Sequence, residues 1–246
     1  MFKPPLRRTA MKTFKHILTT TLIAASIPSF AQSTTITITT DSTVTTTKPT
    51  KPVERVRTDL AIYLGFNGFT GTLPTGYDFR PVGSRYVALA WQTRIPLAVS
   101  GKTKLRLLTG PEVAWNNFMF EGRNTLVAQN GQLVIEPATV NLHKSKLVMA
   151  QLNLPLMLNL GFKSGFSLSM GGYAGIRLDS YTKVKPEGGS AVRTHNTYSL
   201  NPVRWGYMAE LGYRGHAKLF GRYEPNSSFR EGQGPDAGVW TVGIKL

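Results

Sequence analysis

Residues 146–160 read KLVMAQLNLPLMLNL, and apolar side chains recur at every second position along this stretch. Successive side chains of a β-strand point to opposite faces, so the stretch predicts a strand with one apolar and one polar face. The two faces are Val148, Ala150, Leu152, Leu154, Leu156 and Leu158 against Gln151, Asn153 and Asn159. A run of this length is enough for a tilted strand to cross a membrane.

Seven more segments of about ten residues alternate in the same way between Arg57 and Leu246. They are Asp59–Phe69, Arg85–Pro96, Lys104–Phe118, Phe166–Tyr181, Val203–Arg214, Lys218–Glu224 and Gly238–Leu246. The apolar faces carry no charge, and the opposite faces are rich in Gly, Ala, Ser and Asn. We therefore predict an all-β fold, an eight-stranded antiparallel transmembrane up-and-down β-barrel over residues 57–246.

The connections between these segments alternate in length. Long connections follow the first, third, fifth and seventh segments, and short ones follow the second, fourth and sixth. The long ones are Thr70–Ser84, Met119–Ser145, Thr182–Pro202 and Pro225–Ala237; the short ones are Leu97–Thr103, Gly161–Gly165 and Gly215–Ala217. Outer-membrane barrels have short periplasmic turns and long extracellular loops, so both termini are expected in the periplasm.

A soluble β-sandwich or lipocalin-like barrel also alternates, but its outward face should carry charge. The small and polar second faces of these segments favour contact with lipid on the apolar side instead. Pro111 and Pro155 lie inside predicted strands, where each removes a ladder hydrogen bond. We expect a β-bulge or a misplaced strand boundary at both prolines.

The N-terminal residues predict export and a linker. Residues 1–31 have a basic start, an apolar run from Ile17 to Ile27 and small residues before Gln32, as in a signal peptide cleaved near Ala31. Either Met1 or Met11 could be the start. Residues 32–56 are rich in Thr and predict an extended periplasmic linker, in which Ser42 is a candidate for O-glycosylation.

Three motifs carry a family resemblance: Ser145-Lys146-Leu147, Leu152-Asn153-Leu154-Pro155-Leu156-Met157-Leu158 and Gly171-Gly172-Tyr173-Ala174-Gly175. With these motifs the chain resembles the small outer-membrane β-barrel proteins of Bacteroidota, the porin-family or outer-membrane protein β-barrel domain proteins, over about residues 57–246. The resemblance implies an outer-membrane location and the barrel-assembly machinery as a partner during insertion, and it supplies no catalytic residues. The chain departs from the assembly signal by ending in Leu246 rather than an aromatic residue.

The formal net charge of +16 raises the question of a nucleic-acid partner. Export and the lack of a basic–aromatic constellation argue against one. The basic excess lies at the short-turn side and in the tail, where the only acidic residues counted are Glu54 and Asp59. The ten basic residues there are Lys48, Lys51, Arg55, Arg57, Lys102, Lys104, Lys163, Arg214, Lys218 and Lys245. These residues predict contact with phospholipid phosphates, or simply a solubilising rim.

Several charged residues fall on the inward face. A lumen network is predicted from Arg94, Arg106, Glu112, Arg177, Glu210 and Arg222, and Asp179, Arg204 and Glu224 also point inward. An eight-stranded barrel is just wide enough for its own side chains to fill. Buried charges must pair, so we expect Glu112 and Glu210 to pair with Arg106 and Arg222 and to close the lumen.

Aromatic residues predict two interface belts on the outward face. Near the long loops the principal ones are Trp115, Trp205, Tyr207 and Trp240, together with Phe66 and Tyr223; near the short turns they are Phe166 and Tyr213. Outer-membrane lipid is therefore an expected partner of this surface.

The functional prediction is a non-enzymatic integral outer-membrane protein with a structural role, or one that binds ligands or other envelope proteins through its extracellular loops. One alternative is a narrow porin-like channel for small solutes. Another is a lipid-modifying enzyme, for which His143 and His195 in polar loops, near Ser145 and Ser199, are weak candidates. No catalytic constellation, cofactor motif or metal cluster is predicted, and the absence of Cys excludes thiolate sites and disulfides.

Overall fold

The computed structural model describes residues 54–246 except residues 72, 75–76, 81 and 130–131. The predicted signal peptide, with Met1, Met11 and the cleavage site near Ala31, lies outside the described residues, as do Ser42 and the linker up to residue 53. In the part of the chain that is described, no helix is long and apolar enough to span a membrane.

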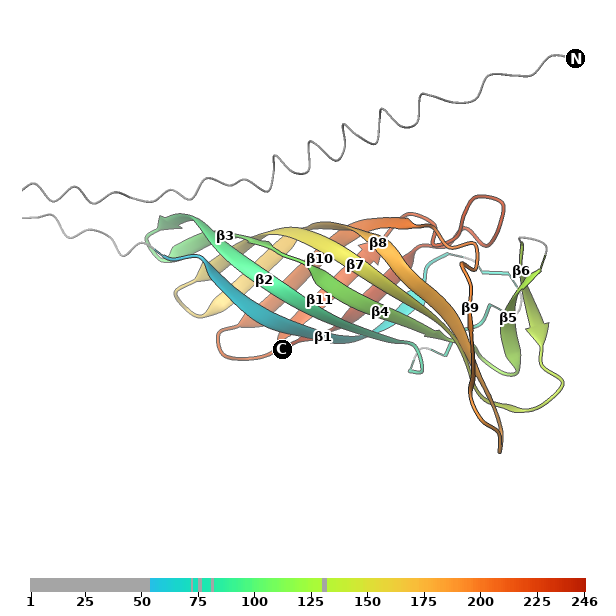
Figure 1. Ribbon diagram of the computed structural model, residues 1–246. Coiled ribbons are helices and arrows are strands. Elements are labelled where there is room, and N and C mark those ends of the chain that lie inside the picture. Colours follow the sequence, from blue (N-terminus) through green and yellow to red (C-terminus); the bar gives the residue numbers. More distant parts are fainter. Residues whose placement is uncertain (1–53, 72, 75–76, 81, 130–131) are drawn as a thin grey trace, which may run out of the picture. The chain divides into compact units, whose positions relative to one another are not determined.

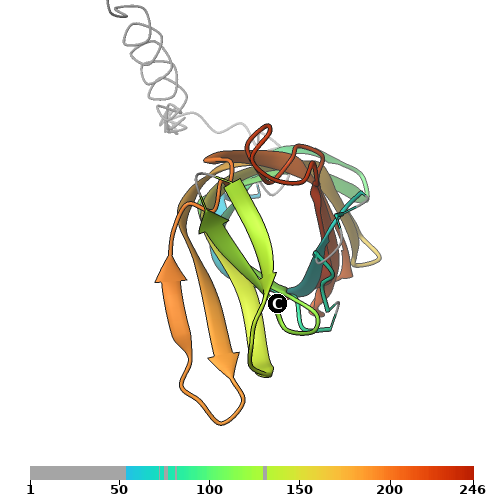
Figure 2. The ribbon, with the colours of Figure 1, turned by 90° about the vertical axis from the view of Figure 1, so that its right-hand side faces the viewer.

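The described chain forms a ring of antiparallel strands (Figures 1 and 2). Its strands are β1 (Arg57–Phe69), β2 (Arg85–Ser100), β3 (Thr103–Thr109), β4 (Glu112–Met119), β7 (Leu142–Phe162), β8 (Phe166–Pro186), β10 (Val203–Tyr213), β11 (Lys218–Glu224) and β12 (Val239–Lys245). Neighbouring strands pair around the ring, with β3 and β4 both lying between β2 and β7, and β12 pairs with β1 from Tyr63–Lys245 to Phe69–Val239. The eight predicted crossings are confirmed, with β3 and β4 together forming the third.

The third crossing is interrupted at Gly110 and Pro111. Gly110 has φ +135°, and a Cβ there would lie 1.9 Å from the carbonyl oxygen of Trp91, so only glycine fits. The expected irregularity at Pro111 is therefore present. The one expected at Pro155 is wrong, because β7 continues through Pro155 in register with Tyr173 of β8. Toward β3 and β4, Pro155 faces the interruption and has no registered partner, so its missing amide proton breaks no ladder there.

Two of the predicted loops contain strands. The loop Met119–Ser145 holds a separate hairpin, β5 (Asn124–Gln129) and β6 (Gln132–Pro137), and β8 runs on to Pro186 and pairs with β9 (Val192–His195). In Figure 1 the β5–β6 hairpin and the β8–β9 extension both lie beyond the same end of the ring. We call this the loop end, and the opposite end, which carries the short turns and the C-terminus, the turn end.

The wall of the ring is apolar outside and polar inside. Along β7, Leu154, Leu156 and Leu158 are between 52 and 58% exposed, whereas Gln151, Asn153 and Asn159 are at most 3% exposed. A soluble barrel would turn its leucines inward. The outward leucines are what a strand surrounded by hydrocarbon requires, and the same alternation recurs in β1, β8, β10 and β12.

Candidate functional site

The lumen is filled by three buried ion pairs at successive heights between the loop end and the turn end. From the loop end, the pairs are Glu224–Arg204, Glu112–Arg222 and Glu210–Lys245. Their side chains are at most 6% exposed. Each carboxylate also accepts a hydrogen bond from a tyrosine hydroxyl, so each of the three buried carboxylates has both a counter-charge and a neutral donor.

The middle pair joins β4 to β11 across the lumen. Arg222 donates from Nη1 to Oε1 of Glu112 at 2.7 Å and from Nη2 to Oε2 at 2.5 Å. Asn153 and Tyr86 donate to the same carboxylate at 2.9 and 3.1 Å. The guanidinium carbon of Arg222 lies 5.0 Å from the ring centres of Tyr63 and Tyr86, so aromatic faces replace its lost water.

The pair nearest the loop end joins neighbouring strands. Arg204 of β10 donates from Nε and Nη2 to Oε2 of Glu224 in β11. Tyr173 of β8 donates to the other carboxylate oxygen at 2.7 Å. The third partner is soft, since Nη1 of Arg204 lies 3.7 Å from the sulfur of Met149. This pair therefore lies at the border between the charged lumen and the apolar side chains above it.

The pair nearest the turn end joins Glu210 to Lys245. Nζ of Lys245 donates to both carboxylate oxygens at 2.8 and 2.9 Å and to Oε1 of Gln92 at 2.6 Å. Tyr63 donates to Glu210 at 2.6 Å. Lys245 is the penultimate residue, so the last strand both closes the ring and supplies a charge to its interior.

The six residues of the predicted lumen network do not form one network in the structure. Glu112 and Arg222 lie together, but Glu210 takes Lys245, and Arg106 does not reach either carboxylate. Arg106 donates to Glu54 at 2.5 and 2.9 Å instead. Arg94 lies at the turn end, 3.0 Å from Asp59, with both side chains more than two-fifths exposed. Arg177 lies near the loop end and donates to Ser180 and the carbonyl of Thr197.

The lumen partners missing from the predicted network had a sequence signal. Lys245, Arg204 and Glu224 all fall on the inward face of the alternation. From the sequence, Lys245 was placed at the short-turn side and Arg106 among the lumen charges. The strand register places the two residues at other heights than expected. Lys245 lies opposite Tyr63, well inside β1, whereas Arg106 lies opposite Asn159, close to the turn end of β7.

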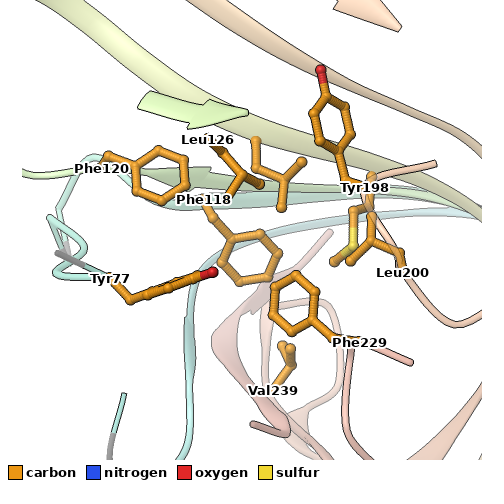
Figure 3. Packing of buried hydrophobic residues seen from close by; sticks show 10 residues of the cluster. Tyr77, Phe118, Phe120, Leu126, Tyr198, Leu200, Phe229 and Val239 are labelled. Carbon is orange, nitrogen blue, oxygen red and sulfur yellow. The ribbon is translucent and has the colours of Figure 1, made fainter. Parts of the chain in front are cut away.

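At the loop end, all four long loops contribute to one apolar cluster over the lumen (Figure 3). Its buried members are Tyr77, Phe118, Phe120, Leu126, Leu147, Met149, Tyr198, Leu200, Phe229 and Val239. Phe69 stacks on Phe118 with ring centres 4.2 Å apart and on Phe229 at 5.8 Å. We call these ten residues the loop-end plug. Burial in it raises the pKa of the Tyr77 hydroxyl.

The plug is a second closure of the lumen, which was not predicted from the sequence. The aromatic residues of the loops are folded back onto the barrel: Phe79 makes a bridge with Phe120, and Leu200 with Phe229. Tyr198 donates to the carbonyl of Thr194 at 2.7 Å, which ties the chain after β9 to the same cluster. Aromatic residues in long polar loops were the available sequence signal.

The turn end is open and basic. A cavity of about 1430 Å³ extends inward from it, and ten of its lining side chains are Lys or Arg while two are acidic. Glu54, inside the range assigned to the linker, is held there by Arg106 and lies 3.7 Å from Lys104. Burial raises the pKa of Glu54, but the hydrogen bonds and charge of Arg106, together with Lys104, outweigh it and hold that pKa below its ordinary value.

The outer wall carries the predicted interface aromatics. Trp205 and Tyr207 are 44 and 59% exposed and form an edge-to-face pair at 5.8 Å. Trp115 and Trp240 are half-buried on the same wall. The register aligns Tyr207, Tyr223 and Trp240 across three neighbouring strands, so these rings lie at one height near the loop end. Phe166 and Tyr213 pair in register at the turn end.

The histidines do not assemble a site with the candidate serines. Nδ1 of His195 lies 3.1 Å from Asp179, a carboxylate that the sequence spacing did not indicate, and the two side chains are 59 and 48% exposed. Ser145 and Ser199 are buried, whereas an attacking hydroxyl must reach its substrate. Within the described ranges, no group of three or more His, Cys, Asp or Glu residues could hold a metal ion.

Comparisons with known proteins identify the family of the chain. No curated protein matches the chain. The crystal structure of Ail, the attachment invasion locus protein of Yersinia pestis, is 12% identical, with 79% of this chain and 100% of that chain covered and a TM-score of 0.33. Ail in complex with the heparin analogue sucrose octasulfate is 11% identical, with 77 and 97% covered and a TM-score of 0.31. The family model described as the outer membrane protein beta-barrel domain matches residues 30–226, and the chain belongs to that family.

Proposed function

We propose that this protein is a non-enzymatic, non-conducting barrel of the outer membrane, which displays a preformed binding surface at its loop end. The observation that carries the proposal is the loop-end plug, because it closes the lumen and fixes the four long loops with one set of contacts. Loops that are already ordered lose little conformational entropy on binding a partner. The expected partner is another protein or ligand of the cell envelope.

The proposed orientation has the loop end outside the cell and both termini in the periplasm, after cleavage of the signal peptide near Ala31. The long and short connections support it, since outer-membrane barrels carry long loops outside and short turns inside. The barrel-assembly machinery would insert the chain, and outer-membrane lipid would surround its apolar wall. The motif from Leu152 to Leu158 supports an origin among the small barrels of Bacteroidota.

A porin-like channel is the less favoured function. A pore needs a continuous water path, but three ion pairs and the plug lie in series along this lumen. The open cavity at the turn end leads only as far as Lys245 and its partners. A lipid-modifying enzyme is less favoured again, because His195 and Asp179 are exposed while Ser145 and Ser199 are buried.

Surface proteolysis of intact cells tests the location and orientation together. Trypsin added outside should cleave after Arg193, in the exposed β8–β9 extension, and should leave the barrel strands intact. The purified protein should also migrate faster unheated than boiled, as closed barrels do. Cleavage only after the envelope is opened would reverse the orientation. A mature chain that stays dissolved as a compact monomer without detergent would refute the membrane location.

A further inference from the structure

Where β7 and β8 rise past the barrel wall, their outward faces carry basic residues directly opposite one another. Lys146 pairs in register with Lys183, and Lys144 with Lys185. Lys183 in turn lies opposite Arg193 of β9. We call the row Lys146–Lys183–Arg193, with Lys144 and Lys185 above it, the basic ladder.

The arrangement is electrostatically unfavourable for the isolated protein. Residues directly opposite in antiparallel strands have Cβ atoms about 5 Å apart, and like charges there destabilise the pair. Among the described residues, no carboxylate forms an ion pair with a member of the basic ladder. Asp179 lies four residues before Lys183 on β8 and pairs with His195 instead. Nζ of Lys146 donates to the neutral Oδ1 of Asn117 at 2.8 Å. An external anion is therefore the missing partner.

The ladder lies at a defined height above the apolar wall. Trp115 of β4 pairs with Ala150 of β7, and Lys146 is four residues further toward the loop end. Four residues of a strand span roughly 13 Å, or about 10 Å along the barrel axis after tilting. Trp115 marks the edge of the apolar belt, so the ladder lies where the headgroups of the surrounding lipid begin.

We propose that the basic ladder binds the phosphate groups of a glycolipid of the outer leaflet, whose acyl chains lie on the apolar wall directly below. Several Lys and Arg side chains on one face match an anion with more than one phosphate, since each can donate charge-assisted hydrogen bonds. The acyl chains would contact the outward side chains of Leu152 and Ile176, which are 37 and 51% exposed. A soluble polyanion would use the ladder but not this wall. The inference rests on the proposed orientation, with the loop end in the outer leaflet.

Binding of lipid A to the purified protein in detergent tests the ladder without depending on orientation or conductance. Diphosphoryl lipid A should bind, and its dephosphorylated form should bind at least about ten-fold more weakly. The variant K146Q/K183Q/R193Q should lose at least about ten-fold in affinity for diphosphoryl lipid A, and added salt should weaken binding to the wild type. The matched control R80Q/R123Q/R230Q removes the same charge at exposed loop positions outside the ladder and should bind like the wild type.

The outcomes separate the possible occupants. Equal loss of binding in both triple variants, or equal binding of the dephosphorylated lipid, would overturn the proposal. Binding of inositol hexakisphosphate as tightly as lipid A would reassign the ladder to a soluble polyanion, and equal binding of phosphatidylglycerol would show no preference for the glycolipid. Surface proteolysis that reverses the orientation would refute the outer-leaflet assignment while leaving the binding result intact.

Thermal unfolding gives a second readout, for which the single variant K183Q removes the charge between Lys146 and Arg193. Without lipid A, K183Q should unfold at the same temperature as the wild type or higher, because the repulsion is relieved. Lipid A should raise the unfolding temperature of the wild type more than that of K183Q. An equal rise in both proteins would contradict a role of the ladder in binding.

Discussion

The loop end of the barrel is closed by apolar side chains, whereas the turn end is open and lined by charged ones. At the loop end, side chains from four loops form an apolar plug that excludes water from the lumen. At the turn end, a cavity of about 1430 Å³ is lined mainly by cations and leads to Lys245. The lumen is therefore accessible from the turn end only. The three ion pairs lie between the plug and this cavity.

The difference shows where the fold can bury aromatic side chains and where it must keep charged side chains hydrated. Aromatic side chains can be buried at the loop end because long loops supply enough chain to fold back over the lumen. The short turns at the other end cannot cover anything, so that opening is lined by long charged side chains that remain hydrated. The buried charges between the two ends are tolerated because each has a counter-charge and each carboxylate also accepts a hydrogen bond from a tyrosine hydroxyl.

The largest expected effect is that of breaking the middle ion pair, Glu112–Arg222, which lies between the loop-end plug and the turn-end cavity. Arg222→Ala leaves Glu112 charged and buried, and loss of one partner of a buried pair costs about 3–5 kcal/mol. We expect the variant to lose its heat-modifiable gel mobility or to unfold at much lower urea concentration from lipid vesicles. The double variant Glu112→Leu with Arg222→Met removes both charges and should recover most of that stability. A double variant as unstable as Arg222→Ala would show that the pair itself is not the cause.

The next largest effect tests the plug. Phe118 is fully buried, stacks on Phe69 and should leave a cavity when shortened. Phe118→Ala should lower the free energy of unfolding by about 3 kcal/mol in urea titrations. The barrel should remain non-conducting, because the ion pairs below are untouched. Steady current through this variant would mean that the plug alone closes the lumen.

A smaller effect is expected on the outer wall at the loop end. Trp205→Ala removes the edge-to-face pair with Tyr207 and should cost about 1 kcal/mol in vesicles. Phe166→Ala at the turn end is the matched comparison, because its register partner Tyr213 occupies the corresponding place there. Equal stability of Trp205→Ala and the wild type would show that the loop-end rings do not anchor the barrel at the interface.

The smallest effect concerns the linker at the turn end. The pKa of Glu54 is below its ordinary value of 4.5, so its contact with Arg106 is fully present above that value and is lost as the pH falls through the lower folded pKa. A fluorophore on Arg55→Cys, the only cysteine in that variant, should lose anisotropy as the pH falls below the ordinary carboxyl value of 4.5 and through the lower folded pKa. The same label on a Glu54→Gln background should give low anisotropy at every pH. Anisotropy independent of pH in both proteins would contradict the contact.

The alternation of side chains was enough to predict all eight crossings and their order, because an outward leucine and an inward asparagine differ at every second residue. The break in the third crossing was only partly predictable. Pro111 signalled an irregularity, but the need for Gly110 arises from Trp91 on the neighbouring strand, which the local sequence does not specify. Pro155 was misjudged for the same reason, since the break in β3 and β4 faces it.

The lumen and the loops show a similar limit. The sequence identifies which charges point inward, but pairing depends on the height of each residue in its strand. Glu210 was expected to pair with Arg106 or Arg222 and instead pairs with Lys245 of the last strand. The loop-end plug joins residues far apart in the chain, such as Tyr77 and Phe229. Their apolar side chains are visible in the sequence, but the contacts between loops are not.

Electrical recording in planar lipid bilayers tests the closed lumen most directly. The purified mature protein, added at micromolar concentration in molar salt, should produce no steady current steps, because the plug and three ion pairs leave no water path. Reproducible pore-like steps from the wild-type protein, with amplitudes proportional to salt concentration, would contradict the account.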